Sequence, residues 1–376
     1  MFESMDEWGP EKVVCVSDTR TGMRGVLVID NTARGMGKGG TRMTPSVTVG
    51  EVARLARNMT WKWAGVDLFY GGAKAGIRFD PESPDKEAAL RAFVRALRNE
   101  VPEEYVFGLD VGLSECDAAI MLDEAGRGGA VGTPHELGGL PYDQLGVTGF
   151  GVAESLDAAA SYRGRSTSSL TVAIQGFGAV GAAAARRLAE LGATVVAVST
   201  ARGGLHHPDG LDVAELLTLR DEYGDALVEH HPTARALAPG DELTVAADAL
   251  IPAALQDVID ERLAARLPAS LIVEGANLPT SPAAQRVLAE RGVTVVPDFI
   301  ANAGGVVAAA VAMDARFSGL APDPRRVFTA ITGKLRAGTE HTLAGAAEHG
   351  ITTHEAARRT AQDRVARAMR LKGRVA

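Results

Sequence analysis

The first half of the chain combines short apolar runs with segments of helical periodicity. Residues 13–17 and 25–30 are rich in valine and isoleucine, which predicts two strands. A glycine-rich loop is expected over 35–41. Two helices that should cover a sheet are predicted from apolar positions recurring every three or four residues: Val52, Leu55, Ala56, Met59 and Trp63 in the first, and Leu90, Phe93, Val94 and Leu97 in the second.

The second half alternates apolar runs with helical patterns, which is typical of βαβ units and a mostly parallel sheet. An alanine-rich helix is expected over 182–191, and strands are expected at 170–174, 194–198, 243–251, 271–273 and 293–296. Beyond about residue 330 the pattern is helical and charged, as in 356–369.

We therefore predict an α/β protein of two domains. Residues 1–145 should form an α/β substrate-binding and oligomerisation domain, with helices over 331–376 packing back onto it. Residues 146–330 should form a Rossmann-type dinucleotide-binding domain.

Composition narrows the classes of partner that the chain is expected to bind. The chain has 376 residues, 46% hydrophobic and 23% charged, which is enough for two cores, and its net charge of -8 includes no basic stripe that would suit a nucleic acid. The N-terminus lacks the pattern of a secretory signal, and the apolar stretch 303–313 is shorter than the roughly 20 residues that cross a bilayer, so no membrane partner and a cytoplasmic location are expected.

Cysteine and histidine suggest no redox or metal chemistry. Cys15 and Cys116 lie in apolar or mixed segments and are expected to be reduced, buried thiols. Adjacent histidines at 206–207 and 230–231 point different ways and have no further ligand at metal spacing, so no metal site is expected.

A glycine motif between a strand and a helix predicts the cofactor site. The segment consists of Gly176, Phe177, Gly178, Ala179, Val180 and Gly181, with GxGxxG spacing. The first glycine permits a tight turn, the second lets the backbone approach a pyrophosphate, and the third lets helix and strand pack closely. Because a strand precedes the motif and a helix and second strand follow it, we expect NAD or NADP to bind here.

The end of the next strand bears on the choice of cofactor. An acidic residue usually holds the ribose 2′-hydroxyl of NAD at this position, but this chain has Thr200, followed by Arg202. Without the carboxylate, and with an arginine able to pair with a 2′-phosphate, NADP or dual use is favoured. The alternative is that Arg202 is only a solvated surface charge.

Three lysines of the first half stand in unusual surroundings: Lys38 in GMGKGG, Lys62 in TWKWAG and Lys74 in YGGAKAG. Glycines beside Lys38 and Lys74 indicate positions where bulk is excluded, which suits the close approach of a ligand. Asp110, in VFGLDVG, is the carboxylate best placed to pair with such a lysine.

The segment LFYGGAKAGIRFDP resembles the active-site signature of the glutamate/leucine/phenylalanine/valine dehydrogenase family, glutamate dehydrogenases above all. Further similar segments follow in the family's order across nearly the whole chain: GMGKGGTRM, the Asp110 loop, ELGG before LGVTGFG, QGFGAVG, VEGANLP and IANAGGV. Such a series is far more specific than one motif.

The resemblance implies NAD(P)-dependent, reversible oxidative deamination of an L-amino acid to its 2-oxo acid and ammonia. Lys74 would activate water, and Asp110 would handle the amine proton. The other implied roles are the substrate α-carboxylate for Lys62, the side-chain carboxylate for Lys38, the nicotinamide side for Thr148 and Asn277, and the reacting carbon for Asn302. Members of the family also form homo-oligomers, often hexamers through the N-terminal domain.

The pattern departs from glutamate-using relatives at two positions. Their usual serine a few residues after NAGGV corresponds to Ala309, and Gly108 is smaller than the alanine common there, which is expected to enlarge the pocket. We favour glutamate because an unpaired Lys38 in a dry pocket would be costly beside an apolar side chain. The alternative is a hydrophobic amino acid, with Lys38 extended to solvent.

Two other classes of function stay open. A catalytically silent dinucleotide-binding module would be indicated by loss of Lys74, Asp110 or the glycine motif, and all are present. A hydroxy-acid dehydrogenase would need a histidine acid/base beside an arginine, and would not need the lysines.

Overall fold

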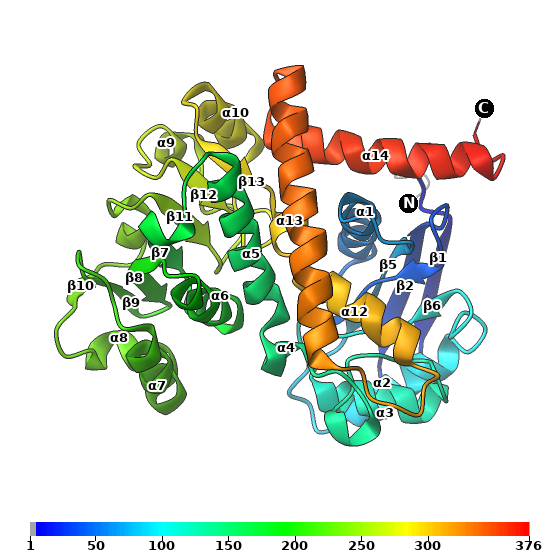
Figure 1. Cartoon of the computed structure of the whole chain (residues 1–376). Coiled ribbons are helices and arrows are strands. Elements are labelled where there is room, and N and C mark those ends of the chain that lie inside the picture. The colour runs from blue at the N-terminus through cyan, green and yellow to red at the C-terminus, as the bar shows by residue number, and fades with distance from the viewer. Residues whose placement is uncertain (1–4, 376) are drawn as a thin grey trace. The chain divides into compact units, whose positions relative to one another are not determined.

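The computed structural model describes residues 5–375, which divide into two compact units (Figure 1). The first unit comprises the chain up to Leu145 together with 306–327 and the segment from Thr360 onward. The second comprises 146–305 and 328–359. This division shares the boundary after Leu145 with the expected one, but 306–327 groups with the first unit and 328–359 with the second.

The first unit is built on a mixed sheet whose strands run in the order β1, β2, β5, β3, β6, with β4 pairing β5. Pairing is antiparallel between β1 and β2 and between β2 and β5, and parallel for the short strands. The strands are β1 (Lys12–Ser17), β2 (Arg24–Asn31), β3 (Gly37–Lys38), β4 (Thr41–Thr44), β5 (Gly71–Arg78) and β6 (Tyr105–Val106).

Helices cover both faces of this sheet. On one face α1 (Val49–Gly65) places Val52 and Ala56 against Val26 and Val28 of β2. On the other, Leu90 and Phe93 of α2 and Met121 of α3 lie in one core with alternate residues of β2 and β5. The remaining bounds are α2 (Lys86–Ala96), α3 (Glu115–Ala125), α4 (Tyr142–Leu145) and α12 (Gly304–Ala315).

The end of the chain returns to the first unit through α14 (Thr353–Leu371). Ala361, Val365 and Met369 of this helix pack with Ala33 and Ala64. The guanidinium of Arg364 donates to the carbonyls of Ala64 and Gly65 at 2.7 and 2.9 Å, which ties α14 to the C-terminal end of α1.

The two cysteines differ from expectation. Cys15 and Cys116 are both free thiols, but both are exposed. Cys15 lies on β1, where the pleat turns alternate side chains away from the α2 core, and the prediction of buried thiols is wrong.

The second unit holds a sheet with the order β10, β9, β8, β7, β11, β12, β13 over the described residues. Strands β8, β7, β11, β12 and β13 pair in parallel, which confirms the mostly parallel sheet expected from the sequence. The strands are β7 (Thr171–Gln175), β8 (Thr194–Thr200), β9 (Gly203–His206), β10 (Arg235–Leu237), β11 (Ala249–Pro252), β12 (Leu271–Val273) and β13 (Thr294–Val296).

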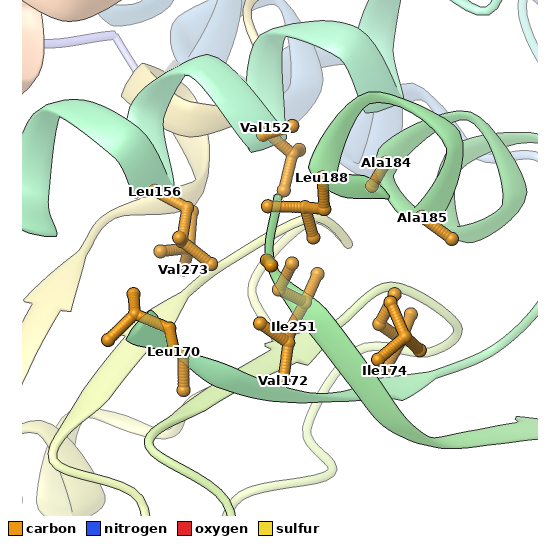
Figure 2. Close-up of a cluster of buried hydrophobic side chains, with 14 of the residues drawn as sticks. Val152, Leu156, Leu170, Val172, Ile174, Ala184, Ala185, Leu188, Ile251 and Val273 are labelled. Carbon is orange, nitrogen blue, oxygen red and sulfur yellow. The ribbon is translucent and has the colours of Figure 1, made fainter. Parts of the chain in front are cut away.

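Because side chains alternate between the two faces along each parallel strand, this sheet has a hydrophobic core on each face. Figure 2 shows the first core, where Val172 and Ile174 of β7 meet Val152 of α5 and Leu188 of α6. Ala173 points to the opposite core with α9 and α10. The helices are α5 (Val147–Tyr162), α6 (Ala179–Glu190), α7 (Val213–Tyr223), α8 (Leu227–His230), α9 (Glu261–Ala264), α10 (Pro282–Glu290), α11 (Asp298–Ala301) and α13 (Pro324–His349).

Glycine-rich segments are where the sequence pattern was misleading. The stretch 35–41 expected as a loop contains the strand β3, and the segment around Lys74 is the central strand β5. The expected long strand over 243–251 is a short 3-10 turn (Asp241–Thr244) followed by β11.

In the described part of the chain one helical segment, 298–315, is long and apolar enough to cross a membrane, and 67% of it is buried, as in the core of a soluble protein.

Candidate active site

Lys74 projects from the middle of β5, and close packing explains the glycines beside it. A Cβ on Gly72 would lie 2.0 Å from the Oγ1 of Thr60, and one on Gly76 would lie 2.5 Å from Val52. Both neighbours belong to α1. The glycines therefore admit this helix onto the strand, which corrects the expectation that they make room for a ligand.

The side chain of Lys74 is 9% exposed, and its Nζ lies 2.8 Å from Oδ2 of Asp110. The same oxygen accepts a hydrogen bond of 3.0 Å from Nε of Arg42, which belongs to β4. Arg42 in turn donates to Glu51 in the first turn of α1 at 2.7 Å. One carboxylate oxygen is thus held between two cations.

These charges fix the ionisation of Asp110. Burial raises the pKa of this carboxyl, but the positive charges of Lys74 and Arg42 outweigh burial and lower the pKa to about 2. The carboxylate is therefore charged at every physiological pH. A substrate amine that displaces the Lys74 ammonium would meet a proton acceptor already in its ionised form.

Lys38 is buried, with only 2% of the residue exposed. Its Nζ donates to the carbonyls of Val106 at 2.9 Å and Phe107 at 3.1 Å. Burial, with the nearby charges of Lys74 and Arg316, lowers the pKa of Lys38 to about 7. The expectation that Lys38 extends to solvent in the hydrophobic alternative is wrong, because these carbonyls hold it inside the unit.

The other expected substrate residues belong to the same unit. A Cβ on Gly108 would lie 2.6 Å from the Nζ of Lys38, so the glycine leaves room for the ammonium itself and does not simply enlarge a pocket. Lys62 lies in the last turn of α1 and is half-buried. Ala309 lies on α12 and is also partly buried.

In the second unit the glycine motif forms the turn between β7 and α6. Gly176 has φ +88°, and a Cβ on Gly181 would lie 1.8 Å from the carbonyl oxygen of Gly176. Gly178 begins α6 with open space around its Cα. The three positions have the geometry of a turn, an exposed approach and a close helix–strand contact, which fits a pyrophosphate at the helix N-terminus.

The remaining motif residues differ in exposure. Ala179 is exposed and Val180 is half-buried on the first turn of α6. The side chain of Phe177 is 2% exposed and belongs to the same hydrophobic cluster as Val172 and Ile174, so only its backbone is available to a ligand.

Thr200 is the last residue of β8 and Arg202 follows the strand, and both side chains already have partners. The hydroxyl of Thr200 donates to the carbonyl of Asp225 at 2.7 Å, and the guanidinium of Arg202 pairs with Glu229 at 3.0 Å. Both members of that ion pair are more than half exposed, so the pair is weak and a stronger anion would displace it.

Asn302 and Asn277 meet at the carboxyl end of β12 and β13. The amide of Asn302 donates to Oδ1 of Asn277 at 3.0 Å and to the carbonyl of Gly275 at 3.2 Å. Thr148 stands on the first turn of α5, and its Oγ1 would lie 3.3 Å from a Cβ on Gly305. These residues share the second unit with the glycine turn.

The structure thus joins Lys38, Lys74 and Asp110 in one unit, and the glycine turn, Asn277 and Asn302 in the other. Sequence reasoning missed Arg42, although it stands in the quoted motif GMGKGGTRM. It also missed Arg316, whose charge acts on Lys38. Among residues 5–375 no group of three or more His, Cys, Asp or Glu side chains is arranged to hold a metal.

A Rossmann-type sheet with this glycine turn, in a chain whose other α/β unit carries a lysine–aspartate pair, is typical of dinucleotide-dependent dehydrogenases. Two family models agree: "Glutamate/Leucine/Phenylalanine/Valine dehydrogenase" matches residues 138–373, and the dimerisation domain of the same family matches 10–127. The chain belongs to the Glu/Leu/Phe/Val dehydrogenase family and is an amino-acid dehydrogenase.

Individual relatives support this assignment. The NADP-specific glutamate dehydrogenase A1 of Halobacterium salinarum is 39% identical over 287 residues, 73% of this chain and 68% of that protein. The NAD-specific glutamate dehydrogenase A of the same organism is 38% identical over 287 residues, covering 73% and 65%. The hetero-hexameric glutamate dehydrogenase from Thermus thermophilus, in its Leu-bound form, superposes with a TM-score of 0.86 at 32% identity over 96% of this chain and 90% of that one.

The glycine turn makes a stability prediction. Gly181→Ala should lower the free energy of unfolding by about 1–3 kcal/mol, because the methyl group overlaps the Gly176 carbonyl and the backbone must shift. Gly178→Ala is the matched control, since nothing lies within 4 Å of its Cβ. Denaturant unfolding of both variants checks this, and equal stabilities would contradict the geometry.

Proposed function

We propose that this enzyme catalyses the NAD(P)-dependent oxidative deamination of L-glutamate to its 2-oxo acid and ammonia, reversibly. The carrying observation is the partly buried Lys74–Asp110 ion pair, with Lys38 close enough for the charge of Lys74 to lower the pKa of Lys38. Both Halobacterium relatives are named glutamate dehydrogenases. In this proposal the first unit binds the amino acid and the second binds the dinucleotide.

Each residue has a defined task in this chemistry. Lys62 holds the α-carboxylate of the substrate, and Lys38 holds the side-chain carboxylate. Asp110 accepts the proton of the substrate amine, and Lys74, once its ammonium has released a proton to solvent, accepts a proton from the water that attacks the iminium carbon. When bound, the nicotinamide dinucleotide supplies the hydride acceptor. Its pyrophosphate would lie at Gly178 and its nicotinamide beside Thr148, Asn277 and Asn302.

The direct test is oxidation of NADH and NADPH by the purified protein with ammonium and a set of 2-oxo acids. Preference for 2-oxoglutarate over 4-methyl-2-oxopentanoate and phenylpyruvate is expected. No ammonium-dependent oxidation with any of them would overturn the proposal. Ammonium-independent reduction of the oxo acid would instead indicate a hydroxy-acid dehydrogenase.

A hydrophobic amino acid is the second candidate, and a specific observation favours it. The Lys38 ammonium already has carbonyl partners at 2.9 and 3.1 Å, so it does not require a substrate carboxylate to be satisfied. Ala309 adds no hydroxyl to the pocket wall. Preference for 4-methyl-2-oxopentanoate or phenylpyruvate in the assay above would select this candidate.

The contact between Gly108 and Lys38 makes this choice testable by mutation. Gly108→Ala should push the ammonium off its carbonyls, because the new methyl group would lie 2.6 Å from Nζ. The displaced charge should raise the preference for 2-oxoglutarate over 4-methyl-2-oxopentanoate by about fivefold, the effect of roughly 1 kcal/mol. Gly50→Ala, where nothing lies within 4 Å of the Cβ, should leave the ratio unchanged. A fall in the Gly108→Ala ratio would contradict this reading of Lys38.

The pKa of Lys38 predicts how specificity changes with pH. With a pKa lowered to about 7, Lys38 carries its positive charge below that pH and loses it above. The ratio of kcat/KM for 2-oxoglutarate to kcat/KM for 4-methyl-2-oxopentanoate should therefore fall as pH rises through 7. The ratio removes effects of ammonium and of the general base, which both substrates share. A ratio that stays constant across this range would show that Lys38 does not bind the carboxylate.

We further propose that the enzyme accepts NADP, alone or together with NAD. Thr200 stands at the end of β8 where an acidic residue usually holds the ribose of NAD, and Arg202 two residues later has an exposed partner, Glu229, that a 2′-phosphate would replace.

Variants of this ion pair test the cofactor proposal. Arg202→Ala should raise KM for NADPH about five- to tenfold and change KM for NADH less than twofold, because only NADPH carries the 2′-phosphate. Glu229→Gln removes the competing carboxylate and should lower KM for NADPH. Equal effects of Arg202→Ala on both cofactors would rule out a 2′-phosphate contact.

We also propose a homo-oligomer, with a hexamer favoured, assembled through the first unit. Residues 10–127 match a dimerisation domain, and the Thermus relative is a hetero-hexamer. Among the described residues β1 is the last strand at one edge of its sheet, and a groove of about 490 Å³ is lined by residues of β1, β2 and β5 and by residues 47–49.

A further inference from the structure

A buried carboxylate that no role above uses lies directly after β12. Glu274 is 1% exposed, and its Oε2 accepts the backbone N–H of Asp298 at 2.8 Å and a hydrogen bond from Nε2 of His354 at 2.9 Å. Its Oε1 is buried without a hydrogen-bond partner in the described part of the chain. A carboxylate so placed needs a compensating positive charge.

His354 supplies that charge from the first turn of α14. Burial lowers the pKa of this imidazole, but Glu274 and Asp298 outweigh burial and the repulsion from Arg358, so the pKa is raised overall. A cation at a helix N-terminus is opposed by the helix dipole. The negative charges of Glu274 and Asp298 are therefore what favours the protonated form of His354 in this position.

Hydrogen bonds lead from this pair to both asparagines of the candidate site. Asp298, whose N–H binds Glu274, accepts the N–H of Leu278 through its carboxylate at 2.9 Å and the N–H of Asn302 through its carbonyl at 2.8 Å. Leu278 follows Asn277 and has a left-handed φ of +50°, which its surroundings must enforce. The amide of Asn302 closes the loop by binding Asn277 and Gly275.

We infer that Glu274 and His354 are positioning residues, a buried ion pair that fixes the loop of Asn277 and the start of α11 and so orients Asn277 and Asn302 toward the dinucleotide. The inference rests on the proposed role of these asparagines. The pair also anchors the beginning of α14, a helix far away in sequence, to the cofactor side of the sheet.

Charge-neutralising variants test the pair. His354→Gln should raise the dissociation constant of NAD(P)H about tenfold, because it leaves the Glu274 carboxylate buried without a cation. Glu274→Gln should weaken binding less, since His354 then becomes neutral. The double variant Glu274→Gln/His354→Gln should return to within about threefold of wild type, because two neutral amides can bind each other. Fluorescence titration of NAD(P)H measures all three.

The pH dependence of cofactor affinity distinguishes an ion pair from an uncharged structural contact, because only the ion pair is lost when His354 loses its proton. With its folded pKa raised, protonated His354 contributes fully below its ordinary pKa of 6.5, and the contribution is lost as pH rises through the raised value. Cofactor affinity of the wild type should weaken over that interval, and this weakening should be absent in Glu274→Gln.

Arg165→Gln is the matched control. It breaks an ion pair of 2.7 Å with Asp248, which binds the N–H of Thr171 at the amino-terminal end of the central strand β7, whereas Glu274 follows the carboxyl end of β12. It should lower stability without changing cofactor affinity. If His354→Gln binds NAD(P)H as wild type does, or if Arg165→Gln weakens binding equally, the inference is overturned. Wild-type protein that fails to turn over any amino acid would instead refute the proposed function.

Discussion

The arrangement of the first unit depends on one partly buried carboxylate, that of Asp110, shared by two cations. Asp110 would be costly to bury alone, and Lys74 and Arg42 make its charged form the stable one. The three side chains come from β5, from β4 and from the loop after β6, so the ion cluster also specifies how these segments come together. The need to neutralise the Asp110 carboxylate therefore shapes both the proposed chemistry and the fold of this unit.

Close backbone packing is what allows that cluster to form. The helix α1 can lie directly on β5 only because Gly72 and Gly76 carry no side chain, and this contact brings Glu51 within reach of Arg42. Gly108 has a similar effect on Lys38, whose ammonium occupies the space that a methyl group would fill. Small residues in this protein thus determine where the charged ones lie.

Periodicity predicted much of the fold, including α1, α2, α6 and the parallel strands β7, β8, β12 and β13. It failed at β3 and β5, because glycines conceal the alternation by which a strand is recognised. Motifs indicated Lys74 and Asp110 as partners, but the orientation of Lys38 depends on carbonyls as far as 69 positions away. The pairing of Glu274 with His354 spans 80 positions and left no local pattern to find.

The most direct measurement is the turnover number of Lys74→Ala, Asp110→Asn and the double variant, with NAD(P)H binding and thermal unfolding as checks that each is folded. If the ion pair acts as one catalytic unit, each single variant should lose about 10³-fold or more in kcat, and the double variant should lose little beyond that. Turnover within tenfold of wild type in either single variant would contradict the account.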